Sequence, residues 1–125
     1  MPIKTLYDKK YRLIQTTCSG RISHSDLSNY QKTVWNDPDI TDFHELIDFS
    51  DANLTEVCFS DLITLAQSAS QVFSITSHSK LALITKTDQQ RRLIDFYISA
   101  RSLAETPTRP IKNFNSLTDA LSWIS

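Results

Sequence analysis

The chain has 125 residues, of which 40% are hydrophobic, enough to bury one core in a single compact domain over residues 1–125. Its formal net charge of −1 excludes the strongly basic character by which many proteins bind nucleic acid or anionic membranes. No apolar run approaches the roughly 18 residues of a membrane span. The opening MPIKTLY also lacks the blocks of a signal peptide, so we expect a cytoplasmic protein.

The first part of the chain predicts a β-hairpin followed by a helix. Strands are expected at 3–7 and 11–17, where apolar residues recur at alternate positions. Ser23 and Asp26 have the spacing of a capping box, which predicts a helix start. The apolar stripe of this helix consists of Leu27, Tyr30, Val34 and Trp35.

The middle of the chain predicts a buried strand and a second helix. FHELIDFS, at 43–50, has an apolar core with one carboxylate, Asp48, near its end. We expect the next helix to begin near Asn53 or Thr55. Its inward residues at helical spacing are Cys58, Leu62, Leu65, Ala66, Ala69, Val72 and Phe73.

Two further strand-then-helix units complete the chain. KLALIT, at 80–85, precedes a helix that Thr87 and Gln90 can cap, and IKNF, at 111–114, precedes a helix that starts at Ser116. The residues expected inside are Leu93, Phe96, Tyr97, Ala100 and Leu103 in the first helix, and Leu117, Ala120, Leu121, Trp123 and Ile124 in the second. The order ββαβαβαβα predicts an α/β fold, a mixed five-stranded sheet flanked by four helices.

Three segments carry a resemblance to a known family. DPDITDFHELIDFS, KLALIT and RPIKNFNSLTDALSWI, the last with Phe114, Ala120 and Trp123 at a recurrent spacing, resemble the small bacterial SpoIIAA-like proteins, whose fold is related to STAS domains. The resemblance implies a mixed sheet flanked by helices. It also implies a role in binding partners, because STAS domains and anti-sigma factor antagonists act in that way.

One functional feature of the antagonists is missing from this sequence. They are switched by phosphorylation of a serine at the start of the second helix, in an Asp-Ser-Ser-Gly setting. The corresponding stretch here, 54–58, reads LTEVC and has neither Ser-Ser nor Gly, so the switch is not carried over. Asp48 and Ser50 match the acidic strand-end pattern, whereas Arg92 and Asp95 stand where many relatives hold a Gly and an Arg.

The edge where the third, fourth and fifth strands end is the candidate site. Ligands of open α/β sheets tend to bind at this edge, and free N–H groups at helix starts favour anions. The alternative is that these polar groups only cap the helices. The candidate residues are Asp48, Ser50, Asp51, Thr55, Lys86, Thr87, Arg91, Asn113 and Ser116.

Asp48 has two interpretations. A carboxylate at the end of an apolar strand must find hydrogen-bond donors, and we expect them to be the Thr55 hydroxyl or backbone N–H groups that open the second helix. The alternative is a catalytic acid or base.

Several chemistries lack their required residues. His24, His44 and His78 share no ligand spacing with one another or with the cysteines, so no metal or other cofactor is expected. One glycine cannot form a phosphate-binding loop, and there is no GxSxG elbow for a hydrolase nucleophile. Cys18 and Cys58 are expected to be reduced and half-buried.

Charge is divided along the chain. Residues 37–61 hold eight acidic side chains and no Lys or Arg, whereas residues 80–112 hold seven Lys or Arg against three acids. The two sets form either complementary faces of one molecule or separate patches that drive weak contacts. We expect a monomer or a weak homodimer, with the acidic segment facing a partner.

Two functions remain open at this stage. The first is a non-enzymatic regulatory module that binds a protein partner and no nucleic acid. The second is a small protein that binds an anionic or apolar metabolite at the strand-end edge.

Overall fold

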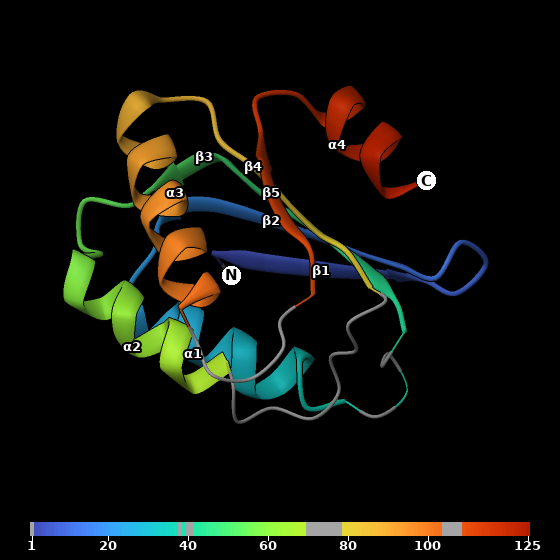
Figure 1. Ribbon diagram of the computed structural model, residues 1–125, viewed down its shortest axis with the longest axis horizontal. Helices are drawn as coiled ribbons and strands as arrows, with labels where there is room; N and C mark the ends of the chain where they lie inside the picture. The colour runs from blue at the N-terminus through green and yellow to red at the C-terminus, as the bar shows by residue number, and fades with distance from the viewer. Residues whose placement is uncertain (1, 38, 40–41, 70–78, 104–108) are drawn as a thin grey trace.

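The computed structural model describes residues 2–37, 39, 42–69, 79–103 and 109–125. Within them, the chain has the element order ββαβαβαβα that the sequence predicts (Figure 1). The strands are β1 (Ile3–Asp8), β2 (Leu13–Arg21), β3 (His44–Asn53), β4 (Leu81–Ile84) and β5 (Ile111–Phe114). The helices are α1 (His24–Val34), α2 (Phe59–Ala69), α3 (Asp88–Ser102) and α4 (Leu117–Ile124).

The five strands form one mixed sheet in the order β1-β2-β3-β4-β5. β1 pairs with β2 antiparallel, and each of the other neighbouring pairs is parallel. The carboxyl ends of β2 to β5 therefore meet at one edge, and β1 is an outer strand of the sheet.

The sheet is covered by different helices on its two faces (Figure 1). The larger core lies under α1, α2 and α3, where Ile47 and Phe49 of β3 meet Leu62 and Leu65 of α2. The smaller core lies under α4, where Ala120 and Ile124 pack on Leu46, Ala82 and Ile84. Alternate residues of β3 thus serve opposite faces, as the pleat of a strand requires.

Three helix starts follow the predicted capping chemistry. Ser23 and Asp26 form a reciprocal capping box at α1, and Thr87 and Gln90 form another at α3. Ser116 accepts the backbone N–H of Asp119 at 3.2 Å and caps α4. These caps depend on residues within one turn, which explains why the sequence predicts them well.

The predicted start of the second helix is wrong. β3 keeps its pairing with β2 as far as Asn53, so the chain is still extended there, and α2 begins at Phe59. Leu54 and Val57, in the connection, are buried instead. Cys58 precedes the helix, and Val72 and Phe73 lie outside the described residues.

Several predicted burials are also wrong. Leu103 is 85% exposed because α3 ends at the residue before it. The apolar residues that α3 buries are Leu93, Ile94 and Tyr97. In α4 the short helix turns only Ala120 and Ile124 fully inward, so Leu117 and Leu121 are exposed. The sequence predicts two half-buried thiols, but Cys18 is buried and Cys58 is exposed. Both cysteines are free thiols.

Candidate functional site

The strand-end edge brings several of the predicted residues together through one glutamine. Gln90 Nε2 donates to the carbonyl oxygens of Ser50 at 3.3 Å and Ala52 at 2.9 Å. Its Oε1 accepts the backbone N–H groups of Lys86 at 2.8 Å and Thr87 at 3.1 Å. Gln90 therefore joins the end of β3 to the turn between β4 and α3.

Other polar groups at this edge are engaged with one another. Asn113 in β5 accepts the Thr85 hydroxyl at 3.0 Å and donates to Asp95 of α3 at 3.1 Å. Arg91 forms an exposed ion pair with Asp88, one helical turn away. Asp51, near the end of β3, and Lys86, in the turn after β4, are both exposed.

Asp48 does not have the predicted partner. Its Oδ1 accepts the backbone N–H of Ser50 at 2.8 Å, whereas the Thr55 hydroxyl donates to Asn53 at 2.7 Å. The prediction fails because β3 continues beyond Asp48, so the residue lies within a strand and not at the entry to a helix. Its neighbours Ile47 and Phe49 face the three-helix core, which places Asp48 on the α4 side of the sheet.

A buried polar cluster lies at the opposite ends of the strands, where no site was predicted from the sequence. Its centre is Glu45, which has no exposed surface and forms an ion pair with buried Arg109 just before β5. The same carboxylate accepts Nε1 of Trp35 at 2.9 Å and also accepts the Tyr30 hydroxyl. Tyr30 in turn hydrogen-bonds the Thr16 hydroxyl at 2.8 Å.

Two guanidinium groups lie beside Trp35. Arg101 and Arg109 are 5.5 Å and 5.3 Å from the ring centroid, distances at which a cation is attracted to the ring face. Arg101 also donates to the Tyr97 hydroxyl at 3.0 Å, which accepts Gln31 Nε2 at 3.1 Å. Nε of Arg109 has no hydrogen-bond partner among the described residues.

The cluster keeps its tyrosines protonated. Burial raises the pKa of Tyr30 well above its usual value, and the negative charge of Glu45 adds to the effect. Burial also raises the pKa of Tyr97, against the opposing charge of Arg101. Both hydroxyl groups are therefore hydrogen-bonding groups and not acids at neutral pH.

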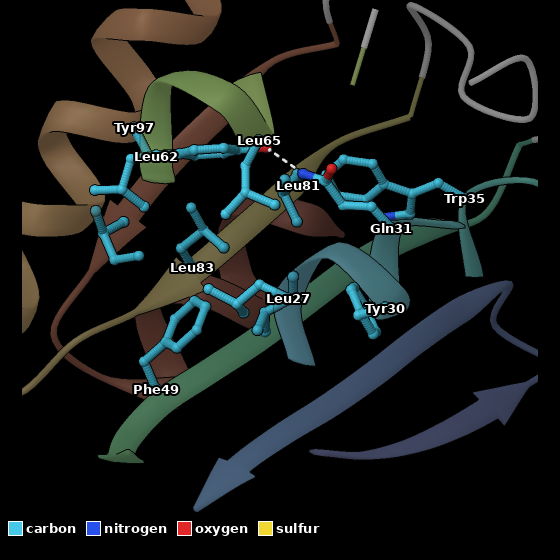
Figure 2. Close-up of a pocket in the computed structure, with 12 residues that line it drawn as sticks. Leu27, Tyr30, Gln31, Trp35, Phe49, Leu62, Leu65, Leu81, Leu83 and Tyr97 are labelled. Carbon is cyan, nitrogen blue, oxygen red and sulfur yellow. Dashed lines mark hydrogen bonds between the residues drawn. The ribbon is translucent and has the colours of Figure 1, made fainter. Parts of the chain in front are cut away.

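A small apolar cavity adjoins this cluster (Figure 2). Its volume is about 50 Å³, and it lies between the sheet and the three helices α1, α2 and α3. Figure 2 shows the Gln31–Tyr97 hydrogen bond on its wall, with leucines from the helices and β4 around it. The other lining residues are Leu27, Tyr30, Trp35, Ile47, Phe49, Leu62, Leu65, Leu81, Leu83 and Ile94.

An open groove runs between α2 and α3 on the outside of the helical layer. Its volume is about 370 Å³. Phe59 packs against Phe96, with ring centroids 4.7 Å apart and ring planes tilted by 59°, and joins the two helices. The groove is lined by Ile63, Ala66, Gln67, Phe96, Ser99, Ala100 and Leu103, none of which is charged.

The buried cluster had one signal in the sequence. Phe43, Glu45, Ile47 and Phe49 alternate along β3 and share one face, so Glu45 occupies an inward position. The ion pair with Arg109 also joins the acidic segment 37–61 to the basic segment 80–112 inside the molecule. Whether the remaining acidic residues face a partner stays a prediction.

No family model matches this chain, and no curated protein matches it. A solved structure does: an uncharacterised protein of the DUF3478 family with a SpoIIAA-like fold, from Shewanella loihica PV-4. The alignment covers 98% of this chain and 94% of that chain, with a TM-score of 0.53 at 17% sequence identity. This chain has a SpoIIAA-like fold. The resemblance that the sequence showed is confirmed at the level of the fold.

In this SpoIIAA-like fold, the stretch 54–58 connects β3 to α2. Leu54 and Val57 are buried in the three-helix core. Thr55 is exposed, and its hydroxyl and backbone N–H both donate to Asn53. Within the part of the chain that the structure describes, no helix is long and apolar enough to cross a bilayer.

Proposed function

We propose that this SpoIIAA-like domain is a non-enzymatic binding module that docks an apolar helical segment of a partner protein between α2 and α3. The observation that carries the proposal is the exposed apolar surface along this groove. Ile63 of α2 is 43% exposed, and Leu103, the residue that follows α3, is 85% exposed. Phe59, near the start of α2, is 52% exposed. Contiguous exposed apolar side chains are typical of interaction sites.

The shape and chemistry of the groove favour a helix as the occupant. α2 and α3 follow successive parallel strands and lie side by side (Figure 1). Ala66 and Ala100 are small residues between larger ones on the walls, an arrangement that accepts the ridge of another helix. The uncharged lining has no ion for a charged segment to pair with, so the contact face of the partner should be apolar.

The size of the cavity under α1, α2 and α3 argues against a metabolite as the occupant. A cavity of about 150 Å³ accommodates benzene, whereas the space under α1, α2 and α3 has only about 50 Å³. A metabolite would have to displace packed leucines. At the strand-end edge, the Gln90 amide and the helix caps already use many of the groups that could bind an anion.

Groove variants test the proposal. Ile63→Glu and Leu103→Glu place charges on opposite walls, and both side chains are exposed enough for the fold to tolerate them. The matched control is Leu121→Glu, which adds the same charge to an exposed leucine of α4 on the other face of the sheet. Proteins captured from the cell of origin by the wild type are purified, and their affinity for each variant is measured by calorimetry.

The expected result is a partner that binds the wild type and Leu121→Glu equally but binds each groove variant at least about tenfold more weakly. Its binding segment should be helical, with apolar residues at i, i+3 or i+4, and i+7. Equal binding to all four proteins would reject the groove. A metabolite that stabilises the wild type saturably in a thermal-shift screen would instead favour the pocket function.

A further inference from the structure

β1 is an outer strand, and among the described strands only β2 pairs with it. Its burial pattern is exposed or intermediate throughout, with Leu6 63% exposed and Tyr7 45% exposed. We propose that this edge pairs, antiparallel, with β1 of a second copy of the chain about a two-fold axis at Leu6. The two sheets would then form one continuous sheet.

The direction of the main-chain groups of β1 follows from one hydrogen bond. Ser19 N–H donates to the carbonyl of Pro2 at 2.9 Å, so Pro2 and Ser19 form a hydrogen-bonded pair in the ladder. Such pairs alternate along an antiparallel ladder. Lys4 and Leu6, opposite Thr17 and Gln15, therefore turn their main-chain groups towards β2.

The remaining residues of β1 turn their main-chain groups outwards. Ile3, Thr5 and Tyr7 thus leave N–H and C=O groups along the free edge, which are a template for another strand. With Leu6 on the two-fold axis, Thr5 of each copy lies opposite Tyr7 of the other. These two residues can exchange both main-chain hydrogen bonds, because both have outward groups.

The side chains of β1 are self-complementary in this register. Lys4 of each copy lies opposite Asp8 of the other, and Leu6 lies opposite Leu6, on the face of the sheet away from α1. These are the non-hydrogen-bonded positions, where cross-strand side chains approach most closely. Lys4 and Asp8 are both exposed in the monomer, and no ion pair between described residues uses either of them.

Neighbouring registers are worse. In any other register, residues with outward main-chain groups must still lie opposite each other, so one strand can slide along the other only in steps of two residues. One such shift places Lys4 opposite Leu6, and the shift in the other direction places Asp8 opposite Leu6. Further shifts place Lys4 opposite Lys4 or Asp8 opposite Asp8, which brings like charges together. Charge therefore selects the register centred on Leu6.

The free edge of β1 is not protected against pairing with a second copy. The strand carries no proline within Ile3–Asp8 and no register shift against β2, two features that commonly protect an edge. The pairing joins one short strand per copy, so we expect a weak, concentration-dependent dimer.

The experiment measures self-association of the full chain by sedimentation velocity over a wide concentration range, at low and high salt. Lys4→Asp should weaken association about tenfold, because it turns both attractive pairs into repulsive ones. Adding Asp8→Lys to it should restore association. Lys112→Asp, on the opposite outer strand β5, makes the same change in net charge and should have no effect.

The main-chain part of the proposal has its own test. Tyr7→Pro removes an outward N–H and should abolish association, whereas Tyr7→Ala removes only the ring and should keep most of it. In the wild type, the amide hydrogens of Thr5 and Tyr7 should gain protection from exchange as concentration rises. Those of Lys4 and Leu6, already in the ladder with β2, should not change.

Each outcome decides the matter. A chain that stays monomeric at every concentration overturns the proposal. So does a dimer that Lys4→Asp and Lys112→Asp affect equally, or one in which Thr5 and Tyr7 gain no protection. A dimer broken by Ile63→Glu but not by Tyr7→Pro would place the second copy in the α2–α3 groove instead.

Discussion

Nε1 of Trp35 donates a hydrogen bond to Oε1 of Glu45 at 2.9 Å inside the protein. This contact joins the residue that ends α1 to an inward position at the start of β3. Arg109 supplies the opposite charge from the segment before β5. Three parts of the chain thus meet at one buried carboxylate, which makes Glu45 the main polar contact of the three-helix core.

Removing that carboxylate should destabilise the fold strongly. Glu45→Ala leaves the guanidinium of Arg109 buried without its counter-charge, and breaking a buried pair in this way typically costs about 3 to 5 kcal/mol. Equilibrium denaturation of the wild type and the variant measures the loss.

A double variant separates the loss of the ion pair from the cost of leaving one buried charge unpaired. Glu45→Leu combined with Arg109→Met replaces both charges by apolar groups, and its loss should be smaller than that of Glu45→Ala. Equal losses would show that the Arg109 charge is not what makes the single change costly.

His44 should make stability depend on pH. Its Nδ1 accepts the backbone N–H of Lys80 at 2.8 Å, which requires an unprotonated nitrogen. Burial lowers the pKa of His44, and the positive charges of Lys80 and Arg109 lower it further. In the unfolded chain the pKa is about 6.5, so the unfolded state binds the proton first as pH falls. The free energy of unfolding should therefore decrease as pH drops through that value.

The variant His44→Asn isolates this contribution. Asn keeps an oxygen that can accept the Lys80 N–H but does not titrate. Denaturation at about pH 7.5 and about pH 5.5 should show a smaller loss for His44→Asn than for the wild type. The same loss in both proteins would assign the pH dependence to other groups.

The two cysteines should differ sharply in reactivity. Burial raises the pKa of Cys18 to about 12, and the charges of Asp48 and Asp26 add to the shift. Cys58 is exposed, just before α2. A thiol reagent at mildly alkaline pH should therefore modify one cysteine of the folded protein, and Cys58→Ser should remove that reaction. Rapid native modification of Cys18 would contradict the packing around it.

Asp48→Ala should have a modest effect. The half-buried carboxylate accepts one backbone N–H, that of Ser50, and losing this bond should lower the free energy of unfolding by about 1 kcal/mol. Asp48→Asn keeps an acceptor and should lose less. An unchanged midpoint for Asp48→Ala would mean that water replaces the carboxylate at the Ser50 N–H.

Local patterns in the sequence predict the order of the elements and most helix starts. Alternating apolar residues indicate strands because successive side chains of a strand point to opposite faces. The pairs Ser23 and Asp26, and Thr87 and Gln90, indicate helix starts because a cap needs only residues within one turn. All of these signals are local, so they can be read from neighbouring letters.

The end of β3 and the burial of its polar residues depend on contacts between distant parts of the chain. Pairing with β2 holds the chain extended through Asn53, beyond the point where local signals predict a helix. Glu45 and Arg109 lie 64 positions apart, and the residues next to either one do not indicate that the two pair. The exposure of Leu103 and the free edge of β1 are likewise properties of the assembled layers. Long-range pairing and packing set these features, and they have no short-range pattern in the chain.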